Sequence, residues 1–426
     1  MTLTPLSSAT ISHWTREQAS KIKADANTTF PEFDPARLWA MMPTYNVWDN
    51  WLVLDERNHI ASVQGYRVLV ALAAPKSKTN GTNLYFFYSE DGVNYEAGGR
   101  MTDGLLAGSQ EWSGSTILRD DGTLQTFYTI ARVSITTLPQ IDQRLATLTQ
   151  NVSVTGGKMV LEKPFYHALL ALPDGNLYQT LAQARTYAKE HPINLIKAGN
   201  RLVNNFCFRD PQFFKDPATQ KAYLLFEANT GAGCCAEASV SRDYIGGAGY
   251  DPLFAASADD ARANGCIGIA EFTNGDYHTL NYLPPLLTTN LVTDEIERPN
   301  LITYQGRYYL FCVTRSHNMT VASKDSAVSV FMLGFCADNL FGPYTPMNDS
   351  GVVIRQRHGA GGEGSHPQNV YSFITLPDLT VLTYANYCNS GTGDVQKLRT
   401  AGPSVRLAIS GTTSRIASIA YSVLAK

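Results

Sequence analysis

Hydrophobic and aromatic residues occur along this chain in short runs that are interrupted by pairs of turn-forming residues. Residues 83–88 (Asn-Leu-Tyr-Phe-Phe-Tyr) are rich in β-prone side chains, and the pair Asp91-Gly92 follows before another short apolar run begins. The pair Asp121-Gly122 separates two similar runs. Asp-Gly pairs between apolar segments favour tight hairpin turns, because glycine adopts the positive φ angles that such turns require. Most of the chain is therefore predicted to form β-hairpins.

The strands that follow these turns resemble one another. Residues 126–129, 223–226, 309–311 and 381–384 each combine aromatic residues with aliphatic or β-branched ones. Recurrent aromatic strands with turn residues between them are typical of radial repetition, as in a β-propeller. Their spacing is irregular, and a β-sandwich or a large barrel gives a similar pattern. The pattern alone predicts an all-β fold and leaves the architecture open among these three.

Two segments depart from the β pattern. Thr15 and Gln18 form a capping-box sequence ahead of residues 19–24, which predicts a short helix in an otherwise irregular lead-in over residues 1–44. Residues 177–192 are predicted to form a helical insertion, because their apolar positions recur with helical spacing and a proline ends the pattern. No linker rich in proline or serine and no block of charge divides the chain. A single domain is therefore predicted over all 426 residues.

The low and nearly balanced charge excludes several classes of function. The formal net charge is −3, and no stretch is rich in lysine or arginine, so neither nucleic acid nor an anionic membrane surface is expected as a partner. The strongest apolar run, residues 68–74, is too short to span a bilayer. Residues 1–23 show no cleavable secretory signal, and seven cysteines in a chain of this length are no disulfide framework. A soluble protein is expected.

Three segments place carboxylates in settings that suit chemistry on a sugar. In residues 48–51 (Trp-Asp-Asn-Trp), Asp49 lies between two tryptophans, whose faces can stack on a sugar ring. An acidic residue so close to large apolar side chains is costly to bury without a role. A turn aspartate beside two core aromatic residues would give the same pattern, so this motif alone does not decide the function.

The second segment is Arg209-Asp210-Pro211. The arginine is expected to keep Asp210 ionised, and the proline fixes the chain direction after it. An ionised carboxylate can hold two adjacent sugar hydroxyl groups and stabilise positive charge that develops on the ring. An ordinary surface ion pair is the alternative, and it would contribute about 0–1 kcal/mol to stability.

The third segment covers residues 294–300 (Asp-Glu-Ile-Glu-Arg-Pro-Asn). On a β-strand, Glu295 and Glu297 lie on the same face while Arg298 points to the other. Two like charges so close raise the pKa of one carboxyl group, as a general acid at neutral pH requires. Cleavage of a glycosidic bond needs such a protonated carboxyl group together with a second, nucleophilic one. A solvated acidic loop is the alternative.

Together, the three segments resemble the levansucrase–inulosucrase family of glycoside hydrolases (family 68). The Trp-Asp-x-Trp, Arg-Asp-Pro and Asp-Glu-Ile-Glu-Arg blocks occur in the family's order. Residues 111–115 (Glu-Trp-Ser-Gly-Ser), which lie between the first two blocks, are similar to another family block. Residues 226–231 and 342–344 also resemble family segments. The resemblance extends over residues 45–344, with weaker traces beyond, and four ordered motifs of this length do not arise readily by chance.

The resemblance implies a single five-bladed β-propeller with a central, funnel-shaped active-site pocket and a few short helices. It implies that Asp49 is the nucleophile that forms a fructosyl-enzyme. By the same resemblance, Asp210 stabilises the transition state and Glu297 is the acid/base. The other residues that it implies bind substrate are Trp48, Trp112, Ser113 and Arg209 around the fructosyl unit, and Glu295 and Arg315 on the glucosyl or acceptor side.

The chain departs from the family pattern at two places. Gram-positive members have a structural calcium site with an aspartate where this chain has Asn204, and residues 231–238 also differ. Asp294 alone cannot supply the six or more oxygen ligands that Ca²⁺ takes, so we expect no metal and no cofactor. The family's tyrosine before a Ser-His pair aligns with Gly364 in a glycine-rich loop, and His366 at the end of this motif is a further candidate for substrate binding.

The predicted function is retaining transfer of a fructosyl group from sucrose to a fructan, to sucrose or to water. Two alternatives share the chemistry, namely a mainly hydrolytic invertase and a synthase of short or inulin-type products. A non-catalytic sugar-binding propeller is the alternative from a different class, and it would lack one of the carboxylates. Sucrose and fructosyl acceptors are the expected partners. The enzyme is expected to act outside the cell, although no signal segment is visible.

Overall fold

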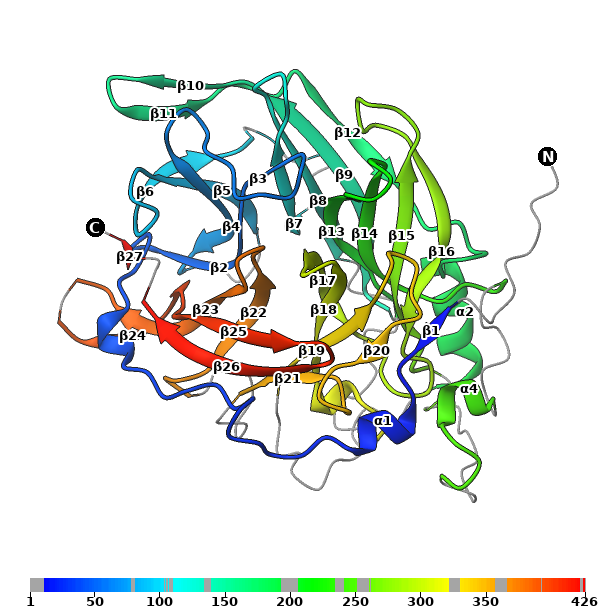
Figure 1. Ribbon diagram of the computed structural model, residues 1–426. Helices are drawn as coiled ribbons and strands as arrows, with labels where there is room; N and C mark the ends of the chain where they lie inside the picture. The colour runs from blue at the N-terminus through cyan, green and yellow to red at the C-terminus, as the bar shows by residue number, and fades with distance from the viewer. Residues whose placement is uncertain are drawn as a thin grey trace.

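Five β-sheets surround a common centre in the computed structural model (Figure 1). Each sheet contains five strands among the described residues. This arrangement is a five-bladed β-propeller, so the predicted architecture is confirmed and the sandwich and large-barrel alternatives are wrong. The structure describes residues 11–77, 81–102, 104, 106, 110–133, 139–192, 206–233, 241–250, 260, 262–321, 330–356, 366–391, 393–421 and 424–425.

The blades follow one another in chain order, and apart from the short added strands β1 and β3 the strand that lies nearest the axis comes first in each. The first blade contains β2 (Tyr45–Leu52), β4 (Arg67–Pro75), β5 (Asn83–Ser89), β6 (Asn94–Arg100) and β27 (Leu424–Ala425). The second contains β7 (Gln110–Leu118), β8 (Leu124–Val133), β9 (Ile141–Gln150), β12 (Tyr166–Ala171) and β3 (Leu54–Asp55). A separate hairpin consists of β10 (Val152–Thr155) and β11 (Lys158–Leu161).

The remaining blades repeat this order. The third contains β13 (Phe208–Lys215), β14 (Ala222–Asn229), β15 (Gly265–Phe272), β16 (Leu280–Thr288) and β1 (Ser12–His13). The fourth contains β17 (Glu297–Tyr304), β18 (Arg307–Arg315), β19 (Val330–Ala337), β20 (Thr345–Pro346) and β21 (Val352–Arg355). The fifth contains β22 (Val370–Thr375), β23 (Thr380–Asn389), β24 (Val395–Ala401), β25 (Ser404–Ser410) and β26 (Thr413–Ala420).

Short strands near both ends of the chain add to blades that are distant from them in the sequence. Strand β1 pairs in parallel with β16 of the third blade, and β27 pairs in parallel with β6 of the first. Between β1 and β2 the lead-in passes the fourth and fifth blades, where Thr29 pairs with Arg355 and Trp39 with Asn389 (Figure 1). The lead-in therefore ties three blades together from outside.

The hydrophobic core is divided into clusters that lie between neighbouring blades. On β14, Leu224 and Phe226 pack toward the second blade, whereas Tyr223 and Leu225 pack toward the fourth. Similar clusters fill all five boundaries, including the one between the fifth and first blades. The middle strands are therefore buried on both faces. This explains why their sequences are continuous apolar runs with little polar alternation.

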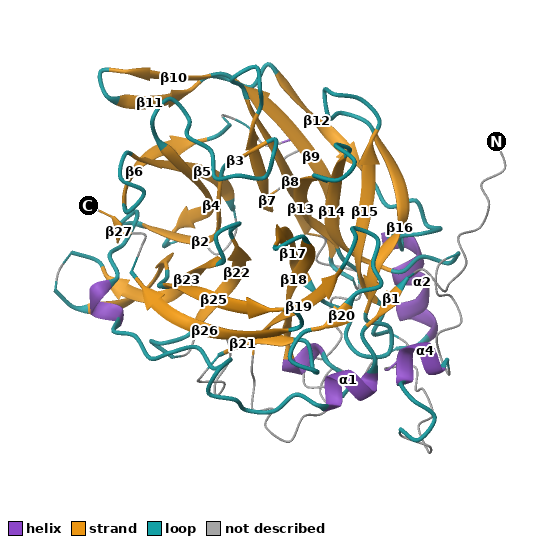
Figure 2. Cartoon of the chain, in the orientation of Figure 1, coloured by secondary structure: helices purple, strands orange, loops and turns teal. Residues whose placement is uncertain are grey.

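The helices are short and lie outside the ring of blades, as Figure 2 shows. Helix α1 (Arg16–Ser20) begins with the predicted capping box, in which Thr15 caps the helix and Gln18 bonds back to it. The helix ends earlier than predicted, since Lys21 forms its C-cap. Helix α4 (Arg242–Ile245) is a single turn. Among the described residues, no helix has the length and apolar character to cross a membrane.

The predicted helical insertion is present as α2 (Leu181–Glu190), although it begins later than residue 177. Tyr178 is fully buried and pairs with Thr230 of the third blade. Its hydroxyl group donates a hydrogen bond to the carbonyl oxygen of Leu283 at 2.5 Å. These contacts hold the segment before α2 in an extended conformation, so the helix starts only after its own cap, Thr180.

Replacing Phe226 by alanine is expected to lower the free energy of unfolding by about 3–5 kcal/mol. Its ring is fully buried between the second and third blades and packs against Gly268, so truncation leaves a cavity. Urea unfolding followed by tryptophan fluorescence measures the change. Phe165→Ala is the matched control, because Phe165 is 64% exposed. Its effect is expected to stay within about 0.5 kcal/mol, and equal losses in the two variants would contradict this account of the core.

Candidate active site

The five strands nearest the axis share an irregularity at the same level of the ring. In each of them, one extra residue interrupts the pairing with the next strand of the blade. Such β-bulges bend a strand and redirect its side chains. The bulges lie between Val47 and Asn50, Trp112 and Gly114, Arg209 and Gln212, Glu297 and Asn300, and Tyr371 and Ile374. They are the places where this propeller turns side chains toward its centre.

The backbone at three of the bulges adopts a conformation that is uncommon outside glycine. Asp210 has φ 56°, Arg298 has φ 53° and Ser372 has φ 68°. Positive φ angles cost free energy for residues with a Cβ atom and persist where surrounding contacts enforce them. Their repetition at corresponding positions of neighbouring blades indicates a functional constraint.

A cavity of about 270 Å³ lies at this level and receives all three predicted carboxylates. Asp49, Asp210 and Glu297 line it, although they are far apart in the sequence. Four other residues singled out by the sequence also line it, namely Trp48, Trp112, Arg209 and Arg315. The cavity has further lining residues that sequence reasoning missed: Leu72, Tyr371, Tyr384 and Arg399.

Asp49 is held by two neighbours on either side of its carboxylate. The hydroxyl group of Ser113 donates a hydrogen bond to one oxygen at 2.9 Å, and Arg298 forms an ion pair with the other at 3.4 Å. Next to Ser113, β7 passes very close to β8 at Gly114. A Cβ atom there would lie 1.8 Å from the carbonyl oxygen of Phe127. The sequence requires glycine at this position for steric reasons.

Asp210 is buried at the bulge of β13, where hydrogen bonds hold both its backbone and its carboxylate. Its N–H group donates to the hydroxyl oxygen of Thr129 at 2.8 Å, and one carboxylate oxygen accepts from the N–H of Arg298 at 3.1 Å. Burial raises the pKa of Asp210 to about 7, and the charge of Arg209 only partly opposes this. Arg209 lowers the pKa of Asp210, as expected, but its charge does not offset the effect of burial. The bulge turns the Arg209 side chain toward other carboxylates.

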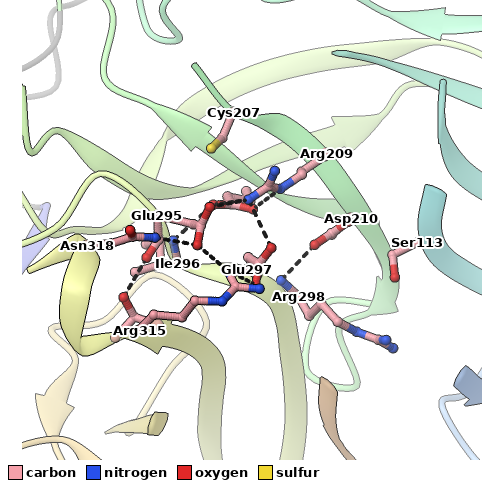
Figure 3. Close-up of polar contacts among 12 residues, drawn as sticks. Ser113, Cys207, Arg209, Asp210, Glu295, Ile296, Glu297, Arg298, Arg315 and Asn318 are labelled. Carbon is pink, nitrogen blue, oxygen red and sulfur yellow. Dashed lines mark hydrogen bonds and ion pairs between the residues drawn. The ribbon is translucent and has the colours of Figure 1, made fainter. Parts of the chain in front are cut away.

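Arg209 is the centre of a buried charge cluster (Figure 3). Its Nε donates to Glu227 at 2.6 Å, and one Nη donates to both Glu295 and Glu297 at 3.1 Å. Glu227 is completely buried and also accepts from the backbone N–H of Ile296 at 2.9 Å. Sequence reasoning missed Glu227. It lies within residues 226–231, a segment noted for its family resemblance without a chemical role.

Arg315 completes the cluster from the next strand. It forms ion pairs with Glu295 and with Glu297, the latter at 2.9 Å, and Asn318 donates a further hydrogen bond to Glu295. Two arginines thus face three carboxyl groups, counting Glu227. The cluster is neutral only when one of the three carboxyl groups holds a proton.

The two glutamates of residues 294–300 titrate differently. Burial would raise the pKa of Glu295, but the charges of Arg315 and Arg209 outweigh it and lower this pKa to about 2. Burial raises the pKa of Glu297 well above the ordinary range, and the charge of Glu295 adds to this against the opposing arginines. The pKa rise predicted for one of the two carboxyl groups agrees in direction with that of Glu297. Burial acts on both groups, and they differ because the arginines outweigh burial at Glu295, whereas burial and the charge of Glu295 outweigh the arginines at Glu297. The pKa of Glu295 is thus lowered while that of its neighbour Glu297 is raised.

This arrangement agrees with what the comparisons with known proteins find. Residues 3–421 match glycoside hydrolase family 68, described as Levansucrase/Invertase. The chain belongs to this family. Its relatives include the levansucrase of Bacillus amyloliquefaciens, which is 30% identical over 443 residues covering 95% of this chain and 88% of the relative. The extracellular sucrase of Zymomonas mobilis is also 30% identical, over 94% of this chain and 91% of the relative.

Solved structures of this family share the fold along its full length. A variant of the levansucrase of B. megaterium is 28% identical and superimposes with a TM-score of 0.81, covering 98% of this chain and 99% of that one. The inulosucrase of Halalkalicoccus jeotgali bound to kestose is 30% identical, with a TM-score of 0.74 and 97% coverage of each chain.

The region of this chain that corresponds to the family's calcium site is described only in part, because Asn204 lies outside the described residues. Asp294 is fully buried, and neither of its carboxylate oxygens accepts a hydrogen bond from the described residues. Burial raises its pKa well above the ordinary range, which fits a neutral carboxyl group. The part of the chain that the structure describes contains no group of three metal-ligating side chains. That no calcium is bound stays a prediction.

Three of the predicted site residues do not line the cavity. Ser113 and Glu295 lie directly behind its wall, bonded to Asp49 and Arg209. His366 lies ahead of β22, and its substrate-binding role stays a prediction. Gly364 lies outside the described residues. Tyr371 lines the cavity instead, and the hydroxyl group of the adjacent Ser372 accepts a hydrogen bond from Arg298.

Proposed function

We propose that the protein is a retaining fructosyltransferase that cleaves sucrose through a covalent fructosyl-enzyme. The observation that carries this proposal is the convergence of Asp49, Asp210 and Glu297 on one cavity of about 270 Å³. Membership of the levansucrase/invertase family supports the choice of sucrose as the donor. A retaining mechanism requires a nucleophilic and an acidic carboxyl group about 5–5.5 Å apart across the scissile bond.

In the first step, Asp49 attacks the anomeric carbon of the fructosyl unit. The carbon–oxygen bond to glucose breaks, and Glu297 transfers its proton to the departing oxygen. Ser113 and Arg298 hold the Asp49 carboxylate in place, which limits its freedom before attack. The excess of carboxyl groups over arginines in the cluster around Arg209 favours the protonated state that Glu297 needs.

Asp210 has a different task, because its carboxylate must be ionised to stabilise positive charge on the fructosyl ring. In this proposal it also holds the ring's hydroxyl groups. Trp48 and Trp112 provide apolar surface for the fructosyl unit. Glu295 and Arg315 lie beside Glu297 and bind the glucosyl or acceptor side.

In the second step, Glu297 removes a proton from the acceptor, whose oxygen attacks the fructosyl-enzyme and releases Asp49. Water gives free fructose, whereas sucrose or a fructan gives a longer product. We favour transfer of the levansucrase type, and an invertase or an inulin-type synthase would use the same carboxylates.

Incubation with concentrated sucrose distinguishes a transferase from an invertase. Each turnover releases one glucose, but free fructose appears only when water is the acceptor. We therefore expect clearly more free glucose than free fructose, with the difference recovered as oligosaccharide or fructan. Quantification of both sugars and of the products by chromatography measures this. Equal release of the two sugars would show that the enzyme is an invertase.

Asp49→Asn is expected to lower the rate of glucose release by about 10⁴-fold or more, because the amide cannot form the covalent intermediate. Calorimetry should still detect sucrose binding. Asp338→Asn is the control, since Asp338 has a side chain that is 82% exposed and pairs with Arg307 away from the cavity. Turnover that survives in Asp49→Asn would refute the nucleophile assignment. Binding without turnover in the native enzyme would indicate a sugar-binding propeller.

The pH dependence of kcat/KM for glucose release is expected to be bell-shaped. Activity falls at high pH as Glu297 loses its proton, and burial shifts this limb upward from the ordinary range of a carboxyl pKa. Activity falls at low pH as Asp210 gains a proton, and burial places its pKa at about 7. Glu297→Gln should lose about 10²–10⁴-fold in rate. Its residual activity should lack the alkaline limb, and an unchanged limb in that variant would exclude Glu297 as the acid.

We also propose that the enzyme acts outside the cell. The relative from Zymomonas mobilis is named an extracellular sucrase. Fractionation of the native host, with enzyme activity measured in medium and cell extract, tests this.

A further inference from the structure

Arg399 differs from the other arginines of the cavity in what its charge contacts. Arg209 and Arg315 both pair with carboxylates of the buried cluster. Arg399 forms no ion pair with a carboxylate of the described residues. Its Nε donates to the side-chain oxygen of Asn386 at 3.3 Å, and its guanidinium lies 5.5 Å from the ring centre of Trp48. The terminal nitrogens are therefore available to a ligand.

The position of Arg399 is fixed by its neighbours. Leu398 and Thr400, on either side of it in β24, are fully buried, so Arg399 points to the opposite face of the strand. Its backbone N–H donates to the side chain of Asn46 at 3.0 Å, which ties β24 to the strand that carries Asp49. The guanidinium also lies 5.8 Å from the ring of Tyr384. Two aromatic faces within about 6 Å hold a cation by electrostatic attraction.

The strand that carries Arg399 suggests which part of a substrate it reaches. The three proposed catalytic carboxylates lie at or beside the bulges of inner strands. Strand β24 instead pairs with β23, the second strand of its blade, so Arg399 reaches the cavity from farther out. A planar guanidinium presents a fixed fork of N–H donors, which suits the adjacent hydroxyl oxygens of a sugar ring.

We propose that Arg399 binds the hydroxyl groups of the sugar acceptor and thereby favours transfer of the fructosyl group to sugar over transfer to water. This inference rests on the proposed function and adds an acceptor-binding residue to it. Trp48 and Tyr384 hold the guanidinium in place, and its free donors bind a sugar that extends outward from the reacting centre. Water gains nothing from these donors.

The ratio of transfer to hydrolysis isolates this role. Water and sugar attack the same fructosyl-enzyme, so the ratio of the two products does not depend on how fast that intermediate forms. Glucose release reports the formation of the intermediate, and the excess of glucose over free fructose reports transfer. A loss of binding of sucrose as the fructosyl donor is thereby distinguished from a loss of acceptor binding.

The test compares Arg399→Gln and Arg399→Lys with the native enzyme at one fixed sucrose concentration. Arg399→Gln is expected to lower the transfer-to-hydrolysis ratio about tenfold, the effect of one lost charge-assisted hydrogen bond. Arg399→Lys keeps the charge without the fork and should give an intermediate ratio. Arg406→Gln is the control, because Arg406 is an exposed arginine of β25 in the same blade, and its ratio should equal that of the native enzyme.

Several outcomes would overturn the inference. An unchanged ratio in Arg399→Gln would do so, whether or not glucose release falls, because a residue that serves donor binding or folding alone leaves the ratio intact. Equal release of glucose and fructose by the native enzyme would also overturn it, since no acceptor binding would exist to lose. Should Arg399→Gln fail to fold, a native ratio in Arg399→Lys would refute the role of the fork. Absence of glucose release from the native enzyme would instead refute the proposed function itself.

Discussion

The balance of charge around Arg209 is the interaction on which the site depends. Arg209 and Arg315 face Glu227, Glu295 and Glu297 in a region with little access to water. An unpaired buried carboxylate costs several kcal/mol, so a cluster with one carboxyl group in excess lowers its free energy by binding a proton. Glu295 is held ionised by both arginines, and the proton goes elsewhere in the cluster. Burial and this excess of carboxyl groups together favour a protonated acid in the cluster.

The geometry of the centre depends on strain that the rest of the propeller must support. Asp210 and Arg298 adopt positive φ angles, each costing on the order of 1 kcal/mol. The N–H groups that these bulges release from the β-ladders are used in the site, since Arg298 donates to Asp210 and Asp210 donates to Thr129. The five clusters between blades supply the packing that keeps the inner strands in these conformations.

Features encoded by local sequence could be predicted, and features created by closure of the ring could not. The capping box at Thr15 and the carboxylate motifs are short patterns, and each was found from its own residues. The adjacency of Arg209 and Asp210 suggested an ion pair, but the bulge sends their side chains in different directions. Glu227 lies in a segment that resembles the family, but nothing in its local sequence indicates that its carboxylate meets Arg209. Arg399 meets Trp48 only because the fifth blade closes against the first.

The same closure separates chemistry from acceptor recognition around the ring. The carboxylates that line the cavity come from the first, third and fourth blades, whereas the fifth contributes Tyr371, Tyr384 and Arg399 among the described lining residues. The fifth blade touches the charge cluster mainly where the Arg315 guanidinium lies 4.6 Å from the ring of Tyr371. Most substitutions in that blade therefore leave the proton count of the cluster unchanged. If acceptor choice resides there, it can change through single residues such as Arg399 while the acid, the nucleophile and their supporting bulges stay as they are.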